Sequence, residues 1–192
     1  LIEKEDMVVT VTSGGYIKRT PLTDFRSQKR GGKGLSGMST KEDDVVTTLF
    51  VANTHTQLLF FTTAGMVYKI KTWRLPIGGR TAKGKAVINM LPIPQGVSIA
   101  AIMPVDRDES DWGDLRIVFA TSDGSVRRNA LSDFTNVKSN GKIAMKLPED
   151  VELINARICS DEDDVMLVTN SGRAIRFKTL DVRVFKGRDS TG

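Results

Sequence analysis

The sequence predicts an all-β, propeller-like fold, and three features of the chain support this prediction. Short apolar runs lead into a turn glycine four times, these glycines recur about every 50 residues, and no stretch shows convincing helical periodicity. At 192 residues the chain is long enough for one sizeable core. We therefore expect a single domain over residues 1–192.

Each repeat begins with a predicted β-hairpin. The segments VVTVTSGG, LLFFTTAG, IVFATSDG and VMLVTNSG align without gaps, and each has Thr three places before its final glycine. A second short run follows the glycine, and an apolar residue recurs ten places after it. Two short runs joined by a turn whose glycine is free to adopt positive φ are typical of a hairpin. The repeats are therefore centred near Gly15, Gly65, Gly124 and Gly172.

The second half of each repeat predicts further strands. Gly34, Gly84 and Gly141 precede short segments, and these are followed by the strand-like runs VVTTLFVA, SIAAIMPV and ELINARIC. Four strands make a blade, and because one blade cannot bury both of its faces, blades must stack. The interval from Gly65 to Gly124 is longer than the other two because it contains an acidic insertion, Asp106–Asp114, which we expect to be a surface loop.

The number of repeats limits the architecture. About four repeats are visible, and the last stops before its glycine-rich second half, so a ring with more blades would make this chain an arc or an incomplete domain. The first residues, LIEKED, are neither an initiator Met nor a signal peptide. We therefore expect the chain to be a piece of a longer protein.

Positive charge follows the repeat. The windows 15–34, 65–85, 124–146 and 172–188 hold 23 of the 28 Lys and Arg residues but only 3 of the 23 acidic residues. An ordinary solvated surface mixes both signs, so this segregation favours a polyanion held along a band of cations. Because exposed aromatic residues do not alternate with the cations, duplex DNA held by its backbone is favoured over a single strand. The candidate DNA-binding residues of this basic band are Lys18, Arg19, Lys69, Arg74, Arg80, Lys83, Lys85, Arg127, Arg128, Lys138, Lys142, Arg173, Arg176 and Lys178.

Only some of these side chains are expected to reach one ligand, because consecutive strand residues point to opposite faces. The densest cationic stretch is the heptad QKRGGKG, which has no carboxylate. Glycines let backbone N–H groups approach an anion closely while neighbouring cations supply charge, which suits a phosphate backbone. A flexible basic loop is the alternative interpretation. The heptad consists of Gln28, Lys29, Arg30, Gly31, Gly32, Lys33 and Gly34.

Several catalytic signatures are incomplete. Gly32–Gly37 matches G-x-G-x-x-G without a helix pattern after it, and Gly79–Lys85 resembles a phosphate-binding loop but has Ala86 where the Mg²⁺-binding Ser or Thr belongs. The backbone amides of Gly79–Lys85 are better suited to DNA phosphates. The single histidine, His55, and the single cysteine, Cys159, are far apart, which argues against a zinc site or a Cys–His pair. We predict no catalytic residues, no metal site and no cofactor bound by this chain.

The cysteine count and the hydropathy indicate the compartment. A single cysteine excludes an internal disulfide framework and fits a reducing cytosol. No apolar run approaches the roughly 18 residues that a membrane span needs. We therefore expect a cytoplasmic protein, associated with the nucleoid through DNA, and no membrane partner.

The heptad Gln28–Gly34 resembles the gyrase-A box of the DNA gyrase A C-terminal domain family, and repeats such as VANTHTQLLFFTTAGMVYKIK resemble its blades. The resemblance covers nearly the whole chain, and the heptad departs from the usual pattern only at Lys29, where Arg is usual. It implies a six-bladed β-pinwheel, in which strands are exchanged between neighbouring blades, and duplex DNA wrapped around a basic outer edge. It also implies a parent enzyme, an ATP-dependent type II topoisomerase, that uses ATP and Mg²⁺ elsewhere and combines the rest of its A subunit with the B subunit to introduce negative supercoils.

Two alternatives remain open. A propeller that serves as a protein-interaction platform would bind acidic partners, and the related C-terminal domain of topoisomerase IV would have the same fold with weaker DNA bending. The intact heptad argues against the second. Salt dependence distinguishes the first, because contacts with many phosphates predict a steep loss of affinity as salt rises.

Overall fold

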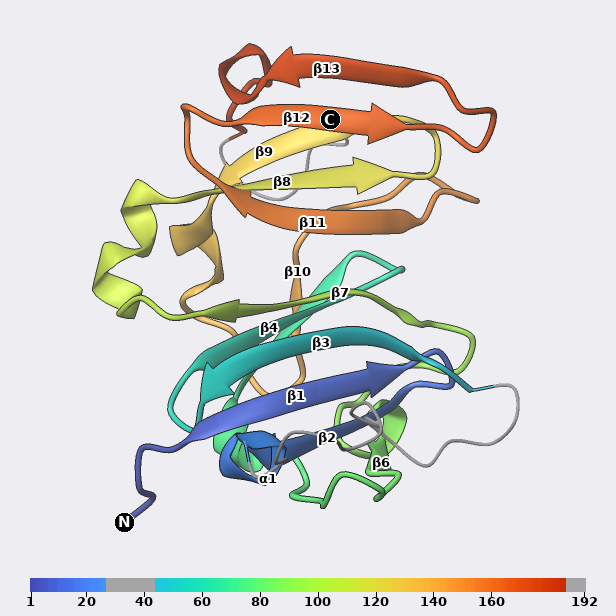
Figure 1. Cartoon of the computed structure of the whole chain (residues 1–192). Helices are drawn as coiled ribbons and strands as arrows, with labels where there is room; N and C mark the ends of the chain where they lie inside the picture. The colour runs from blue at the N-terminus through green and yellow to red at the C-terminus, as the bar shows by residue number, and fades with distance from the viewer. Residues whose placement is uncertain (27–43, 186–192) are drawn as a thin grey trace. The chain divides into compact units, whose positions relative to one another are not determined.

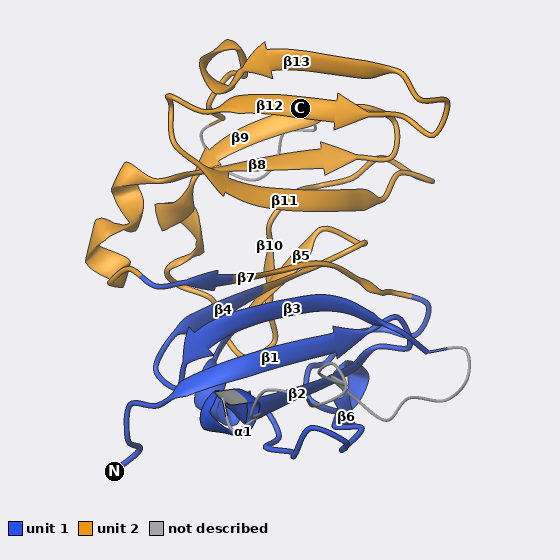
Figure 2. Ribbon diagram, in the orientation of Figure 1, with its two compact units in different colours: residues 1–59, 69–96, 104–106 blue, residues 60–68, 97–103, 107–192 orange. Residues whose placement is uncertain are grey.

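The computed structural model describes residues 1–26 and 44–185, and within them strands predominate. By its internal contacts the chain divides into two compact units, which are described separately (Figure 2). Unit 1 consists of Leu1–Leu59, Lys69–Gly96 and Pro104–Asp106, and unit 2 of Phe60–Tyr68, Val97–Met103 and Arg107–Gly192. The single domain expected from the sequence stays a prediction.

The first sheet has the strand order β3-β1-β2-β6 (Figure 1). Its strands are β1 (Asp6–Thr12), β2 (Tyr16–Pro21), β3 (Val46–Asn53) and β6 (Lys85–Ala86). All pairings are antiparallel, and β1 places Val9 opposite Arg19 on one side and Phe50 on the other. The short helix α1 (Thr23–Arg26) follows β2.

The second sheet repeats this plan with the order β10-β5-β4-β7. Its strands are β4 (Gln57–Thr62), β5 (Met66–Lys71), β7 (Ile99–Val105) and β10 (Lys142–Ile143). Two smaller sheets complete the described chain, in the orders β11-β8-β9 and β12-β13. Their strands are β8 (Arg116–Thr121), β9 (Val126–Ala130), β11 (Leu153–Cys159), β12 (Asp164–Val168) and β13 (Ala174–Lys178).

Short 3₁₀ turns connect these strands. They are η1 (Thr72–Arg74), η2 (Val87–Asn89), η3 (Glu109–Asp114), η4 (Leu131–Phe134) and η5 (Thr179–Asp181). The acidic insertion was expected to be a surface loop, but η3 lies within it and buries Trp112, whose Nε1 donates to the Arg107 carbonyl at 3.0 Å. An apolar indole with a bonded N–H anchors the insertion to its own unit.

The four predicted hairpins are present, and their turns share one hydrogen bond. In each turn the amide of the glycine donates to the carbonyl of the threonine three residues earlier, at distances from 2.9 to 3.1 Å. The glycines Gly15, Gly65, Gly124 and Gly172 have φ between +78° and +85°. The predicted positive φ is therefore confirmed at all four, where a side chain would be strained.

In the first three hairpins, the residue after the turn threonine joins the hairpin to the next strand of its sheet. The Ser13 amide donates to the Val45 carbonyl at 2.8 Å, and the Val45 amide donates back to the Ser13 hydroxyl at 3.2 Å. Thr63 makes the same reciprocal pair with Ser98, and Ser122 makes it with Glu152. A small hydroxyl residue at this position therefore fixes where the outer strand begins.

Strand exchange between repeats is confirmed by the sheet order. Strand β6 follows the second hairpin in sequence but pairs with β2 of the first, and β10 follows the third hairpin but pairs with β5 of the second. Gly84 and Gly141, which precede these strands, have φ of +83° and +82°. A Cβ at Gly84 would collide with the carbonyl oxygen of Ile17 in β2, so glycine is required where the exchanged strand approaches.

The cores follow the alternation of the strands. Unit 1 buries apolar residues of β1, β2 and β4 such as Val9, Ile17 and Leu58. In unit 2, Phe61, Phe119 and Phe134 pack edge to face with ring centroids 5.3 to 5.9 Å apart. Of the apolar residues ten places after the turn glycines, Leu75 and Phe134 are buried, whereas Phe25 and Val182 are half-buried.

Candidate nucleic-acid interface

In unit 1, one stretch of backbone carries three candidate DNA ligands. This stretch, Gly78–Lys85, is called the strap, and its cations are Arg80, Lys83 and Lys85. At its start the Gly78 amide donates to the Arg19 carbonyl of β2 at 3.0 Å. At its end Lys85 enters the β2–β6 ladder. The strap is therefore tied at both ends to the second strand of the first hairpin.

Lys18 holds the middle of the strap. Its side chain is fully buried, and its Nζ donates to the carbonyl oxygens of Gly79 at 2.7 Å and Arg80 at 2.9 Å. Burial lowers the pKa of this ammonium below its ordinary value of 10.5. The prediction that Lys18 contacts DNA directly needs correction, because β2 directs the side chain inward and its charge is bonded to backbone carbonyls. The neighbouring Arg19 donates from Nε to the Leu75 carbonyl at 2.9 Å.

Three further cations of unit 1 lie over aromatic rings. The distances to the ring centroids are 3.9 Å for Lys83 over Tyr16, 5.9 Å for Arg80 over Phe25 and 4.9 Å for Arg74 over Trp73. A ring face attracts a cation without neutralising it. Arg74 and Lys85 are exposed, and Arg80 and Lys83 are half-buried, so these four charges remain within reach of solvent.

Asp44 brings a negative charge to the turn of the first hairpin. Its Oδ1 accepts from the Gly14 amide at 2.7 Å and from the Ser13 hydroxyl at 2.9 Å. Burial raises the pKa of this carboxyl, but the bonds from Gly14 and Ser13, with the nearby charge of Lys83, outweigh burial and leave the pKa below its ordinary value of 3.8. Asp44 therefore remains ionised and opposes an anion at this turn.

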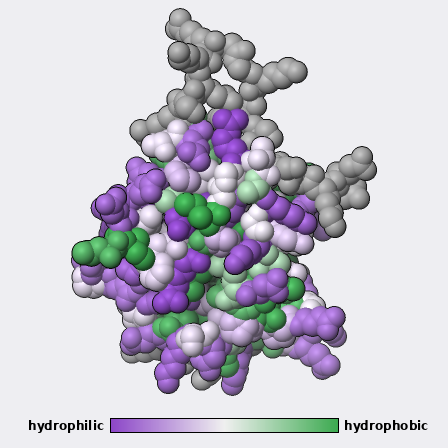
Figure 3. Space-filling model, turned by 90° about the horizontal axis from the view of Figure 1, so that it is seen from below, coloured by the Kyte–Doolittle hydropathy of each residue, from purple (hydrophilic) through white to green (hydrophobic). Residues whose placement is uncertain are grey.

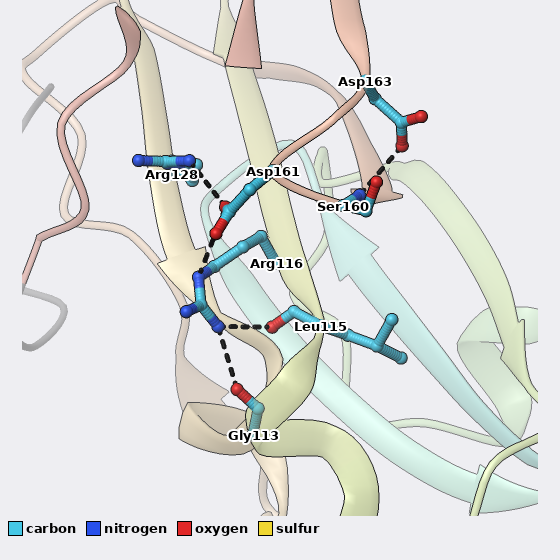
Figure 4. Close-up of polar contacts among 7 residues, drawn as sticks. All are labelled: Gly113, Leu115, Arg116, Arg128, Ser160, Asp161 and Asp163. Atoms are coloured by element: carbon cyan, nitrogen blue, oxygen red, sulfur yellow. Dashed lines mark hydrogen bonds and ion pairs between the residues drawn. The ribbon is translucent and has the colours of Figure 1, made fainter. Parts of the chain in front are cut away.

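In unit 2, two predicted DNA ligands are structural. Arg127 is fully buried and donates to the Ala144 carbonyl, and Arg128 is 6% exposed. Arg128 Nη1 lies 2.8 Å from Asp161 Oδ1, and a dashed line marks this ion pair in Figure 4. The same carboxylate lies 3.8 Å from Nε of Arg116. The prediction of direct DNA contacts by Arg127 and Arg128 needs the same correction as for Lys18, because partners in the fold neutralise or enclose both guanidinium groups.

Arg116 extends this ion cluster to the insertion. Its Nη1 donates to the carbonyls of Gly113 at 2.9 Å and Leu115 at 3.2 Å (Figure 4). The cluster thus joins β8, β9 and the turn before β12 within unit 2. Its role is to hold strands together.

The remaining candidates divide by exposure. Lys138, Arg173 and Lys178 are exposed. Arg176 is exposed and forms an ion pair with Asp164, with Nε 2.7 Å from the carboxylate oxygen. Lys69 is half-buried, and Lys142 is half-buried with Nζ donating to the Asp133 carbonyl at 2.6 Å. Both units therefore offer exposed cations.

The heptad Gln28–Gly34 lies outside the described residues, so its role stays a prediction. Within residues 1–26 and 44–185, no group of His, Cys, Asp and Glu is placed to hold a metal ion, and no helix has the length and hydropathy of a membrane span. On the face seen in Figure 3, hydrophilic residues predominate and hydrophobic residues lie in separate patches. That pattern favours a charged ligand over an apolar one at this face.

Sequence reasoning missed uncharged residues that hold a neighbouring backbone segment or a cation in place. Thr20 donates from Oγ1 to the Gly78 carbonyl at 2.8 Å, and Asn129, five places after the turn glycine like Thr20, donates to the Phe185 carbonyl at 3.4 Å. Tyr16 lies beneath Lys83. The only indication in the sequence is that Thr20 and Asn129 occupy the same position in their repeats. That position can be interpreted only when it is known that a segment of the next repeat crosses there.

Comparison with known proteins matches this architecture. The family model described as "DNA gyrase C-terminal domain, beta-propeller" matches residues 6–53, 56–106, 116–160 and 163–192. The A subunit of DNA gyrase from Rickettsia bellii is 47% identical over 192 residues, and that from Granulibacter bethesdensis is 50% identical over 194 residues. Each match covers 100% of this chain and 21% of the relative. The chain thus spans about a fifth of the length of these curated relatives.

Two solved structures share the fold. The C-terminal domain of DNA topoisomerase IV superposes with a TM-score of 0.81 at 23% identity, covering 99% of this chain and 57% of that one. The DNA gyrase A C-terminal domain superposes with a TM-score of 0.70 at 25% identity, covering 96% and 58%. The four matched family segments coincide with the four repeats found in the sequence.

Proposed function

The chain belongs to the DNA gyrase C-terminal domain family, and from that premise we propose that it binds duplex DNA without sequence specificity and wraps it. The observation that carries this proposal is that the cations recur in the same part of successive repeats. Exposed cations such as Arg74, Lys85, Lys138 and Arg173 lie in the segments that follow the turn glycines of repeats two to four. Regularly spaced cations with few acids between them suit a regular polyanion.

The proposed chemistry is phosphate binding by many weak contacts. Each Lys or Arg that neutralises a phosphate releases condensed counterions, so binding is strong at low salt and independent of sequence. Bending a stiff duplex costs on the order of several kcal/mol at a tight site, and contacts spread along the bend offset this cost. The heptad residues Gln28–Gly34 would hold the backbone most closely, because glycines admit it to the main-chain amides.

We assign the strand-passage chemistry to other parts of the parent protein. The parent would be an ATP-dependent type II topoisomerase that uses ATP and Mg²⁺ outside this chain. It would combine the rest of the A subunit with the B subunit in the bacterial cytoplasm, and its DNA substrate would make it nucleoid-associated. Within that enzyme, wrapping would present a segment of the bound DNA for passage and so give supercoiling its direction. The intact heptad and the 47–50% identity to gyrase A sequences favour gyrase over topoisomerase IV as the parent.

A topological assay tests the proposal. Relaxed circular plasmid is incubated with the chain, treated with a nicking–closing topoisomerase, stripped of protein and resolved on a gel. A linking-number shift that grows with protein supports chiral wrapping. Mobility-shift binding without a linking-number change would remove wrapping from the proposal, and the absence of binding at low salt would remove DNA as the ligand.

A further inference from the structure

The strap of unit 1 differs from an ordinary surface loop in what holds it. Within the strap, the described structure has a single backbone hydrogen bond, from the Ala82 amide to the Gly79 carbonyl at 3.1 Å. The Gly79 carbonyl also accepts from Lys18 Nζ, and so does the next carbonyl, that of Arg80. A buried charge from another strand therefore supplies more bonds to the middle of the strap than the strap supplies itself.

The position of Lys18 fixes the direction of two peptide groups. The C=O and N–H bonds of a trans peptide point in opposite directions, and the described part of the chain has no cis peptide bond. Because the carbonyls of Gly79 and Arg80 point at the Lys18 ammonium, the amides of Arg80 and Thr81 point away from it. Among the described residues, no backbone carbonyl accepts a hydrogen bond from either amide.

Gly84 leaves room for this lysine, whereas a side chain at Gly78 would meet it only at an ordinary contact distance. A Cβ at Gly84 would lie 3.0 Å from Lys18 Cβ, and a Cβ at Gly78 would lie 3.5 Å from Lys18 Cδ. The aliphatic part of Lys18 thus runs beneath the two ends of the strap, with its charge under the middle. Thr20 closes one end with its bond to the Gly78 carbonyl.

We propose that the strap is a preorganised phosphate site and that Lys18 is its positioning residue, an inference that rests on the proposed DNA-binding function. The amides of Arg80 and Thr81 would donate to one phosphate oxygen each, and Arg80, Lys83 and Lys85, which belong to the same strap, would add positive charge. Successive backbone N–H groups in a turn form a known type of anion-binding site, and the bond from the Ala82 amide to the Gly79 carbonyl makes this part of the strap a turn. Since Lys18 is bonded to the carbonyl ends of the same peptides, it holds the amide ends in place and polarises them toward an anion.

The first test follows the two amides directly. Heteronuclear NMR spectra of the 192-residue chain are recorded while a short blunt DNA duplex is added. The Arg80 and Thr81 amide resonances should move downfield and saturate with the binding isotherm. If they stay in place while resonances elsewhere report binding, the strap is not a phosphate site.

The second test removes the positioning charge. Lys18→Met keeps the length of the side chain but deletes its ammonium. The variant should bind the duplex about three- to tenfold more weakly, and the slope of log affinity against log salt should become shallower by about one to two, as if phosphate contacts had been lost. Lys4→Met is the matched control, because it deletes an exposed charge outside the basic windows and should leave both quantities nearly unchanged.

Stability is separated from positioning by a further variant. If Lys18→Met fails to fold, Thr20→Val takes its place, since it removes only the bond to the Gly78 carbonyl and should also weaken the response of the two amides. A folded Lys18→Met or Thr20→Val chain with the wild-type salt slope and amide shifts would overturn the inference. A wild-type chain that binds no duplex would instead overturn the proposed function.

Discussion

Asp44 closes the first hairpin turn through its bonds from Gly14 and Ser13, and its ionisation is linked to folding. Its pKa in the folded chain lies below the ordinary 3.8. The unfolded chain therefore takes up the proton at a higher pH than the folded chain does. Stability from this carboxylate is fully present above pH 3.8 and is lost as the pH falls through the lower, folded value.

We expect Asp44→Asn to lower the urea midpoint at neutral pH, because an amide accepts weaker hydrogen bonds than a carboxylate. The gap from wild type should be constant above pH 3.8 and narrow below it. Equilibrium urea unfolding across that range measures this gap. Glu162→Gln, at an exposed carboxylate, is the control and should show a much smaller gap. A gap for Asp44→Asn that does not narrow in acid would contradict the linkage.

At the scale of single residues, the positions of cations in the sequence do not tell which of them contact a ligand. This is clear from Lys18, Arg127 and Arg128, which are buried. Strand alternation predicts that only some cations of the basic band face a ligand, but not which ones. The carbonyls that enclose Lys18 are 61 and 62 residues away in sequence. A buried cation needs such partners, and no local pattern reveals them. A cationic residue in a strand is therefore expected to contact a ligand only where no segment of another repeat covers its side chain.

Arg128 shows how strongly a buried cation depends on its ion-pair partner. Its side chain is 7% exposed, and its partner Asp161 is 48% exposed. The buried guanidinium needs the carboxylate more than the carboxylate needs it, because unpaired buried charge is strongly destabilising whereas a half-exposed acid is solvated. A cation used in this way stabilises the fold and would contribute only indirectly to the proposed DNA binding.

At the scale of elements, strand exchange depends on a glycine. Gly84 combines φ of +83° with a Cβ position that overlaps the Ile17 carbonyl, so Gly84→Ala should detach β6 from β2. We expect a loss of about 2–4 kcal/mol in the free energy of unfolding, since backbone strain and a main-chain collision add. Chemical denaturation measures the loss, and amide hydrogen exchange at Lys85 and Ala86 locates it.

Gly79→Ala is the matched control for that prediction. It lies in the same strap, and a Cβ there meets nothing within 4 Å. Its effect on stability should stay within about 0.5 kcal/mol. Equal losses for Gly79→Ala and Gly84→Ala would mean that the strap as a whole tolerates no side chain and that strand exchange is not the cause.

The strands were easier to predict from the sequence than the strands with which they pair. The hairpins follow from apolar runs and a turn glycine, and the outer strands β3, β7 and β11 follow from apolar runs such as ELINARIC. Strands β6 and β10 have two residues each, too few for any periodicity. Their pairing with an earlier hairpin came from family resemblance, because a two-residue strand is defined by the carbonyls that it meets. The burial of Trp112 was likewise not predicted, because the acidic residues around it indicate an exposed loop.

At the scale of the whole molecule, affinity and wrapping are different quantities. In the proposed DNA binding, affinity adds over the exposed cations of both units, and each would contribute through counterion release. Wrapping also requires that the duplex be held at the place where bending stress concentrates, and close approach of backbone amides suits that task better than long flexible side chains. The sequence places its glycines and cations together most densely at Gln28–Gly34.

Replacing the heptad Gln28–Gly34 with alanines should therefore abolish the linking-number shift while retaining most of the affinity. The change removes three cations of the 23 in the basic windows, so duplex affinity should fall by only about tenfold at moderate salt. The matched control replaces Arg173, Arg176 and Lys178 with alanine, which removes the same charge from another repeat. That control should lower affinity to a similar extent and keep the shift. If the alanine heptad still shifts the linking number, wrapping depends on total charge alone, and the glycine-rich heptad is one contact among many.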